Sequence, residues 1–292
     1  MKKYKANSLI LNDEVRANAT DGAFVKLPSG ITHYKVEGDG EWVVLTHGYA
    51  TPYFIYDKIA EGLVKNGYKV LRYDLYGRGL SDRVDAVYTP KFFANQLDEL
   101  TKAIIGEEPF YLFGTSMGGI ITTTYTAAHP EKVKKLVLLA PAGMVFKGPA
   151  YMKLARLPLI GGIFSLFSAK ILTKGCASEM LFSGEEAKEY YTEQFAYYTQ
   201  YKGMPKAVLS SLRNTILNFD ENLLGYEGTR EAKTPVLVIW GTNDKTMPYY
   251  QNETMKKVLP DMKLITYEGS GHIFLYDEGE RTLKDVLPFL AE

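Results

Sequence analysis

The feature that most constrains this chain is a serine at the centre of a sharp turn between a strand and a helix. Residues 110–119 read Phe-Tyr-Leu-Phe-Gly-Thr-Ser-Met-Gly-Gly, an apolar strand that runs into G-x-S-x-G ahead of a stretch compatible with a helix. Gly114 and Gly118 let the backbone fold tightly on either side of Ser116. A helix N-cap is the structural alternative for such a serine. The strand before it and the helix after it favour a serine presented as a nucleophile.

Strand and helix patterns alternate on both sides of this turn, which predicts a mostly parallel, eight-stranded sheet flanked by helices. The predicted strands are 24–27, 31–36, 41–46, 69–74, 110–113, 135–139, 235–240 and 263–267. The predicted helices of the same layer system are 52–66, 90–105, 117–128, 249–258 and 278–290.

The alternation stops in the middle of the chain, where aromatic-rich helical stretches at 185–201 and 205–218 replace the strands. We interpret 1–142 and 231–292 as one α/β core. Residues 143–230 are then a helical cap, or lid, inserted after the sixth strand. We expect this cap to determine which substrates fit, because it would cover the carboxyl ends of the strands, where open α/β sheets bind ligands.

A serine hydroxyl needs a base to accept its proton, and the chain has four histidines. His272 lies in Gly-Ser-Gly-His, a glycine-rich turn directly after the last predicted strand. His33 lies within an early strand, and His129 ends a helix. His47 precedes Gly48 in a tight turn after the third strand, which suggests that it supports that turn. We therefore expect His272 to be the base.

The base in turn needs a carboxylate that fixes its tautomer and orientation. We expect this acid in the loop after strand 235–240, the predicted strand that precedes the one before His272. Asp244 is the only carboxylate in the loop Gly-Thr-Asn-Asp-Lys-Thr-Met-Pro after strand 235–240. A turn-forming aspartate is the structural alternative. We expect Asp244 to hold His272.

An acyl-transfer site also needs donors for the oxyanion that forms on the attacked carbonyl. The backbone N–H of Met117, directly after the serine, is one candidate, and the N–H of Tyr49 in the turn His47-Gly48-Tyr49 is the other. In the loop 74–82 we expect Arg78 and Asp82 to pair.

Five segments carry a resemblance over nearly the whole chain: 45–49 (LTHGY), 73–82 (YDLYGRGLSD), 114–119 (GTSMGG), 241–244 (GTND) and 269–272 (GSGH). With them the chain resembles the α/β-hydrolase superfamily, whose order of nucleophile, acid and base is that of Ser116, Asp244 and His272. The resemblance implies those catalytic roles. Capped carboxylesterases and monoacylglycerol-lipase-like enzymes look most similar. Epoxide hydrolases and haloalkane dehalogenases use an aspartate at the position of Ser116, so the resemblance argues against those two activities. Carbon–carbon bond hydrolases have a similar serine motif but usually carry a tryptophan where this chain has Ile273. We therefore rank them below the esterases as the branch that the chain resembles.

The expected activity is hydrolysis of a carboxylic ester through an acyl-enzyme, with an apolar acyl or alcohol part held by the cap. The apolar stretch 154–172 either covers the pocket, which we favour, or contacts a lipid surface transiently. Perhydrolysis, acyl transfer and a non-catalytic receptor for small molecules on the same fold are alternatives. The expected substrate-binding residues are Met144, Phe146, Phe164, Phe167 and Ile273.

Composition limits the remaining classes of function. Lys plus Arg equals Asp plus Glu at 34 each, so no basic excess predicts nucleic acid as a partner. One cysteine, Cys176, fits a reducing compartment, and we expect a cytoplasmic protein without a cleaved signal or a membrane span. We expect no metal and no cofactor, because the histidines are dispersed and no ligand pair stands at metal spacing.

Overall fold

The computed structural model describes residues 4–145 and 185–292, and its centre is one eight-stranded sheet in the order β1-β2-β4-β3-β5-β6-β7-β8. β1 pairs with β2, and β2 with β4, in antiparallel fashion, and the other pairs are parallel. The predicted mostly parallel, eight-stranded sheet is thereby confirmed. The strands are β1 (Ala23–Leu27), β2 (Gly30–Glu37), β3 (Glu41–Thr46), β4 (Tyr68–Tyr73), β5 (Phe110–Thr115), β6 (Val133–Leu139), β7 (Val236–Gly241) and β8 (Lys263–Tyr267).

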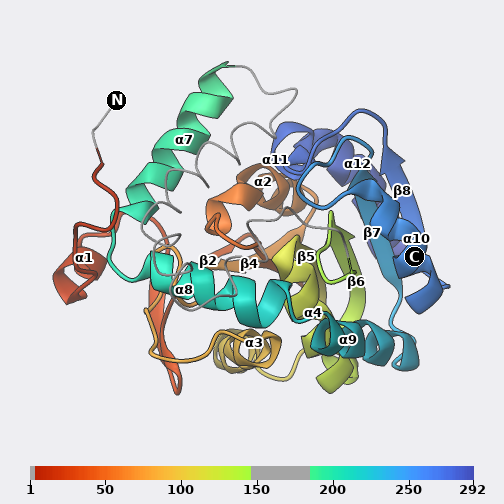
Figure 1. The fold of residues 1–292 in the computed structure, drawn as a ribbon, viewed down its shortest axis with the longest axis horizontal. Coiled ribbons are helices and arrows are strands. Elements are labelled where there is room, and N and C mark those ends of the chain that lie inside the picture. Colours follow the sequence, from red (N-terminus) through yellow and green to blue (C-terminus); the bar gives the residue numbers. More distant parts are fainter. Residues whose placement is uncertain (1–3, 146–184) are drawn as a thin grey trace.

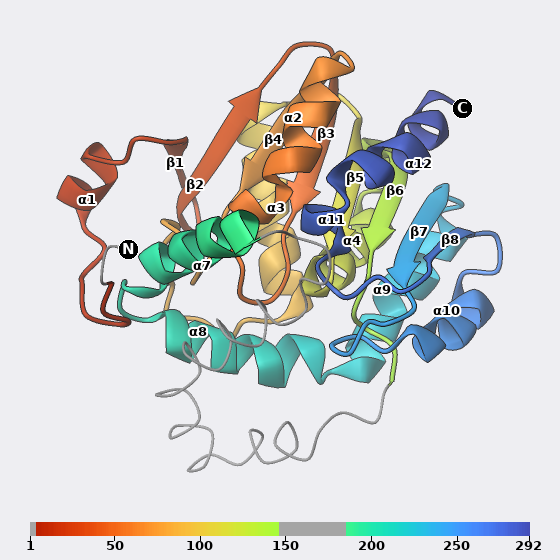
Figure 2. The same ribbon diagram turned by 90° about the horizontal axis from the view of Figure 1, so that it is seen from above.

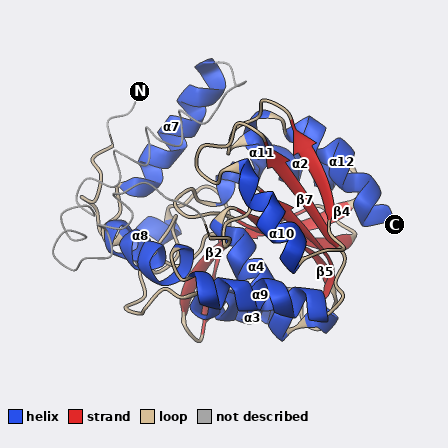
Figure 3. Cartoon of the chain, turned by 45° about the vertical axis from the view of Figure 1, so that its right-hand side comes forward, coloured by secondary structure: helices blue, strands red, loops and turns tan. Residues whose placement is uncertain are grey.

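Helices cover both faces of the sheet, with α3 and α4 on one face and α2 and α12 on the other (Figures 1 and 3). Because both faces are covered, strands β5 and β7 are buried along their whole length, and their sequences are mostly apolar. The helices of this layer system and the short turns beside them are α1 (Asp13–Ala17), η1 (Tyr53–Tyr56), α2 (Asp57–Lys65), α3 (Pro90–Ile104), α4 (Met117–Ala128), η2 (Pro130–Lys132), η4 (Tyr249–Gln251), α10 (Asn252–Val258), α11 (Phe274–Asp277) and α12 (Gly279–Ala291).

Three further helices lie in the described part of the chain between β6 and β7: α7 (Glu185–Thr199), α8 (Met204–Ser211) and α9 (Phe219–Glu231), with a π-helical turn η3 (Leu212–Ile216) after α8. Figure 2 shows α7 and α8 at the edge toward which β3 and β6 point. The sequence did not predict α9, and the helix expected at 205–218 changes into the π-helical turn at Leu212. Gly203 directly ahead of α8 and Pro205 in its first turn signal where that helix starts, whereas α9 lacks a single apolar face.

α9 packs closely on α4 of the sheet layer. The Thr229 hydroxyl donates to the Thr123 carbonyl at 3.2 Å. A Cβ atom on Gly225 would lie 3.0 Å from the Thr124 backbone nitrogen, so a glycine there permits the close approach. This contact joins the segment after β6 firmly to the helix that begins beside Ser116.

The N-terminal segment lies along the connection between α7 and α8. Asn7 N–H donates to the Thr199 carbonyl at 2.9 Å, and Lys202 N–H donates to the Leu9 carbonyl at 2.8 Å. Segments that are far apart in the sequence therefore share backbone hydrogen bonds. No helix within the described ranges is long and apolar enough to cross a membrane.

Candidate active site

Ser116 sits at the junction of β5 and α4 in a strained backbone conformation, with φ 52° and ψ −121°. A non-glycine residue in this region costs about 1–3 kcal/mol and persists only where its surroundings impose the conformation. Three backbone hydrogen bonds do so: Ser116 N–H donates to Leu139 O at 3.0 Å, and Ser116 O accepts from Gly119 and Ala142 N–H at 2.9 Å each. The turn is thus held by β6 and the chain that follows it.

Two glycines make this turn sterically possible. A Cβ atom on Gly114 would lie 2.4 Å from the Thr122 hydroxyl, and one on Gly118 would lie 2.3 Å from the Thr46 carbonyl oxygen. Neither distance is compatible with a real side chain. The glycines of G-x-S-x-G therefore allow the start of α4 to pass directly against β3 and β5.

Asp244 and His272 are joined by a hydrogen bond of 2.7 Å between Asp244 Oδ2 and His272 Nδ1. The other carboxylate oxygen, Oδ1, accepts the N–H groups of Thr246 and Met247 at 2.9 and 2.7 Å. Because a carboxylate only accepts, Nδ1 of His272 carries a hydrogen and Nε2 is left as a proton acceptor. The carboxylate is fully buried, whereas the imidazole keeps 12% exposure.

The loops that carry this pair are tied together beneath it. Asn243 N–H donates to Ser270 O at 3.0 Å, and Thr242 N–H donates to Tyr267 O at 3.0 Å. A Cβ atom on Gly241 would lie 2.3 Å from that same Ser270 oxygen, so only glycine fits there. Ser116 follows β5, Asp244 follows β7 and His272 follows β8, so all three lie at the carboxyl edge of parallel strands.

The turn after β3 lies directly beside Ser116. A Cβ atom on Gly48 would be 3.1 Å from Ser116 Cβ and 3.7 Å from its Oγ. Tyr49 follows in this turn, and its hydroxyl donates to Val208 O of α8 at 3.0 Å. Met117 is the first residue of α4, where helix N–H groups have no intrahelical acceptor. The structure thus places both predicted oxyanion-donor residues next to the serine.

His47 supports the same turn, as its position suggested. It is fully buried, and its Nε2 accepts the Leu75 N–H at 2.9 Å, so the hydrogen is on Nδ1, which donates to Gly48 O at 2.9 Å. Burial lowers the pKa of His47 to about 4, so the ring is neutral. His47 therefore has a structural role: it connects the turn after β3 to the loop after β4 through two hydrogen bonds.

The expected pairing of Arg78 with Asp82 is wrong. Fully buried Arg78 donates to Tyr49 O at 2.9 Å, Tyr76 O at 3.1 Å and Ser211 Oγ at 2.9 Å. Asp82 instead binds the Arg16 guanidinium and accepts the Ile31 N–H. The sequence pattern of the loop could not reveal this, because the acceptors of Arg78 come from three separate segments.

Helices from the insertion reach the same turn. Tyr191 of α7 and Thr51 share a hydroxyl–hydroxyl hydrogen bond of 2.8 Å. Together with the hydrogen bonds from Tyr49 to Val208 and from Arg78 to Ser211, this contact joins α7 and α8 to the loops that follow β3 and β4. Sequence reasoning missed these residues, since tyrosine and serine on helices carry no distinctive spacing.

The residues expected to bind substrate are only partly described. Met144 is buried where the chain leaves β6, and Ile273 is buried directly after His272. Phe146, Phe164 and Phe167, like Cys176, lie outside the described residues. Within 4–145 and 185–292, no group of three His, Cys, Asp or Glu side chains could hold a metal ion.

A second histidine–aspartate pair lies away from Ser116 and is completely buried. His33 Nδ1 and Asp74 Oδ2 are 2.7 Å apart, and Asp74 also accepts the N–H groups of Tyr53 and Leu80 at 3.1 and 3.0 Å. Burial opposes charge on both groups, but their hydrogen bond and mutual attraction raise the pKa of His33 and lower the pKa of Asp74. This pair could not be predicted from the sequence, because its members come from β2 and the loop after β4.

Comparison with known proteins agrees with this fold. The family described as serine aminopeptidase, S33 matches residues 40–279. The AB hydrolase superfamily protein YisY of Bacillus subtilis is 25% identical over 89% of this chain and 96% of its own length. A 2-hydroxy-6-oxononadienedioate/2-hydroxy-6-oxononatrienedioate hydrolase of Dechloromonas aromatica is 26% identical over 94% and 96%. The solved esterase EaEST of Exiguobacterium antarcticum superposes with a TM-score of 0.78 at 20% identity, covering 93% of this chain and all of that one.

Proposed function

This chain belongs to the serine aminopeptidase S33 family of α/β-hydrolases, and on that premise we propose that it cleaves carboxylic esters through an acyl-enzyme formed on Ser116. One observation carries the proposal: the 2.7 Å hydrogen bond from His272 to Asp244 lies at the same sheet edge as the strained Ser116 turn. Because Nδ1 is the nitrogen that donates to Asp244, Nε2 of His272 is the nitrogen that would serve as the base.

In the proposed reaction, His272 Nε2 takes the Ser116 hydroxyl proton as Oγ forms a bond to the ester carbonyl carbon. The backbone N–H groups of Met117 and Tyr49 stabilise the negative charge that moves onto the carbonyl oxygen. The carbon–oxygen bond to the alcohol then breaks, and His272 returns its proton to the leaving oxygen. Water repeats the sequence on the acyl-enzyme, giving the acid and free Ser116.

We further propose that residues 143–230 form the cap that limits the substrate. Hydrogen bonds from Tyr49 to Val208 and between Thr51 and Tyr191 support this role, because they connect the insertion to the turn beside the nucleophile. Met144, just after β6, and Ile273, directly after His272, are buried apolar residues, which suits a substrate with an apolar acyl or alcohol group. A monoacylglycerol-type substrate is one member of this class.

The test is a chain-length series of p-nitrophenyl esters on the wild type, Ser116→Ala and the control Ser8→Ala, whose hydroxyl only donates to the nearby Lys5 O in an exposed hydrogen bond. An amino-acid p-nitroanilide belongs in the series because of the family's description. We expect Ser116→Ala to lower kcat/KM at least about 10⁴-fold. A fluorophosphonate should label Ser116 in the wild type, as located by peptide mapping. Retained turnover in Ser116→Ala would overturn the proposal.

Cleavage of a carbon–carbon bond in a hydroxy-oxo dienedioate is a second candidate. The Dechloromonas aromatica relative, whose name is that of such a hydrolase, favours it. The two candidates separate when the wild type is offered both substrate classes, because a carbon–carbon hydrolase would consume the dienedioate with a larger kcat/KM than any ester. Adding hydrogen peroxide to the ester assay and analysing the products distinguishes perhydrolysis from hydrolysis.

A further inference from the structure

A cavity of about 570 Å³ lies between α7, the N-terminal segment and the start of α2. Ser116, Asp244 and His272 do not line it, so it is separate from the candidate active site. Its walls hold five aromatic rings and three carboxylates. The rings are those of Tyr4, Phe54, Tyr190, Tyr197 and Tyr198, and one of the carboxylates is that of Glu193.

The charge of the cavity wall is negative. Of its three carboxylates, Asp21 pairs with Lys35 at 2.8 Å and Asp57 pairs with the Arg72 guanidinium. Glu193 forms no ion pair and no hydrogen bond with any residue that the structure describes. One carboxylate is therefore available to balance a cation that enters from solvent.

The aromatic wall also carries a hydroxyl group, that of Tyr198. Tyr198 is 6% exposed and lines the cavity, and its hydroxyl makes no hydrogen bond within the described ranges. A tyrosine hydroxyl both donates and accepts, so this group can exchange a hydrogen bond with a bound ligand. The ring of Tyr198 stacks on Phe54 at 6.0 Å between centroids and meets Tyr197 edge-on at 5.0 Å.

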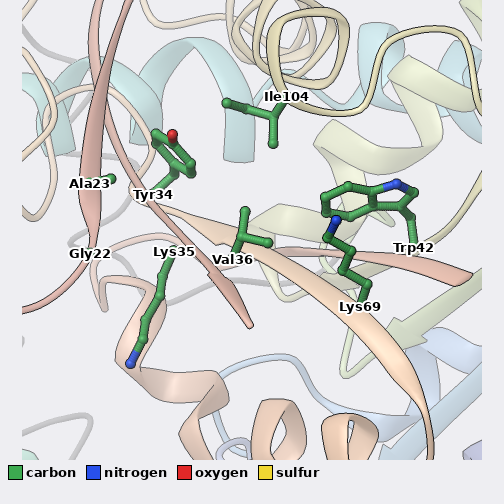
Figure 4. A pocket seen from close by; sticks show the side chains of 8 residues that line it. All are labelled: Gly22, Ala23, Tyr34, Lys35, Val36, Trp42, Lys69 and Ile104. Carbon is green, nitrogen blue, oxygen red and sulfur yellow. The ribbon is translucent and has the colours of Figure 1, made fainter. Parts of the chain in front are cut away.

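A second pocket of this protein differs, because a lysine of the protein itself already covers its aromatic ring. At the sheet edge around β2, Lys69 places its ammonium 4.4 Å from the centre of the Trp42 ring (Figure 4). Lys35 also lines that pocket, and the two lysines disfavour binding of a cation there. Among the described residues, no lysine or arginine stacks on Tyr4, Tyr197 or Tyr198.

We propose that the cavity beside α7 binds a small organic ammonium ion, with Glu193 as its counter-ion and the rings of Tyr197, Tyr198 and Tyr4 around its alkyl groups. Aromatic faces attract cations, and cages of such rings are the usual way in which proteins hold quaternary ammonium groups. The Tyr198 hydroxyl accepts a hydrogen bond from a ligand that carries its own hydroxyl.

The test titrates the full chain by calorimetry with choline and with 3,3-dimethyl-1-butanol, a neutral molecule of the same shape. We expect choline to bind at least about tenfold more tightly, because only the cation gains from the rings and the carboxylate. Equal affinity for the two, or no binding of choline at millimolar concentrations, would overturn the proposal. This comparison needs no variant.

Glu193→Gln should weaken choline binding about tenfold. Glu189→Gln removes the same charge from an exposed position of the same helix outside the cavity, and should change the affinity less than about twofold. Equal losses in the two variants would indicate general surface charge and would refute the site. If Glu193→Gln fails to fold, Tyr198→Phe replaces it, with an expected loss for choline and none for tetramethylammonium, which lacks a hydroxyl. The ester assay plays no part in these outcomes.

Discussion

Gly48 lies so close to Ser116 that a single added carbon on it would stand 3.1 Å from Ser116 Cβ. The turn that carries the proposed oxyanion donor is therefore in van der Waals contact with the proposed nucleophile. A displacement of either residue changes the distance between donor and attacked carbonyl, and such distances govern catalysis steeply.

We predict that Gly48→Ala lowers kcat/KM for a p-nitrophenyl ester about 10–100-fold, mainly through kcat, because the added methyl pushes the turn away from Ser116. Gly106→Ala is the control: its side chain would meet open space, although its φ of 80° disfavours alanine. That variant should lose stability and keep kcat. Kinetics and thermal unfolding of both variants check the prediction, and an unchanged kcat in Gly48→Ala would contradict it.

Asp244→Asn should leave the fold intact and reduce kcat about 10³–10⁴-fold, because an amide can donate to Nδ1 and so favours the wrong tautomer of His272. Thermal unfolding should shift little, since the amide oxygen can still accept the N–H groups of Thr246 and Met247. Asp261→Asn, on an exposed loop, is the control for loss of one negative charge. A kcat within tenfold of the wild type would assign Asp244 a purely structural role.

Arg78→Lys should lower kcat about tenfold with little change in KM. Three hydrogen bonds, to Tyr49 O, Tyr76 O and Ser211 Oγ, hold Arg78 in its buried place, and a lysine cannot reach all three acceptors. Arg78 is a positioning residue in this interpretation, since it acts through the Tyr49 turn. Arg281→Lys at the surface is the matched control. A rise in KM with unchanged kcat would point to the pocket instead.

The buried pair of His33 and Asp74 predicts a pH-dependent stability. The raised pKa of His33 means that its contribution is complete below its unfolded pKa of about 6.5 and is lost as the pH rises through its folded pKa. The lowered pKa of Asp74 means that its contribution is present above an unfolded value of about 3.9 and is lost as the pH falls through its folded pKa. The pair therefore stabilises most between about pH 4 and 6.5.

His33→Gln should accordingly cost about 3 kcal/mol of unfolding free energy near pH 5.5 and less at pH 9. Urea unfolding at both values measures the difference. His129→Gln, at a partly exposed histidine, should cost under about 1 kcal/mol at either pH. A His33→Gln cost that is the same at both pH values would show that the ring is not charged in the native protein.

The sheet could be read from the sequence because each of its strands has its own apolar run between turn residues. Strand 41–46 and helix 117–128 have the predicted bounds, and β6 begins only two residues earlier than expected, at Val133. Strand order was beyond reach, since β4 lies between β2 and β3 through pairings that depend on tertiary contacts. The same holds for α9, whose buried side rests on α4.

Residues in loops after strands could be predicted when chemistry singled them out, as for Asp244 and His272. Arg78 could not be placed, because a guanidinium among three carbonyl and hydroxyl acceptors leaves no local pattern. His33 and Asp74 are 41 positions apart and meet only after β2 and β4 pair. Long-range polar contacts of this kind follow from the packed fold and not from spacing.

The order of the strands along the chain has a consequence for biosynthesis. Ser116 leaves the ribosome well before Asp244 and His272, and its strained turn depends on Leu139 and Ala142, which follow soon after. The segments that form the serine turn are therefore synthesised before His272, the proposed proton acceptor. Under the proposed mechanism, the growing polypeptide has no esterase activity until the loop after β8, which carries His272, has been synthesised. Only the completed chain would then hydrolyse esters.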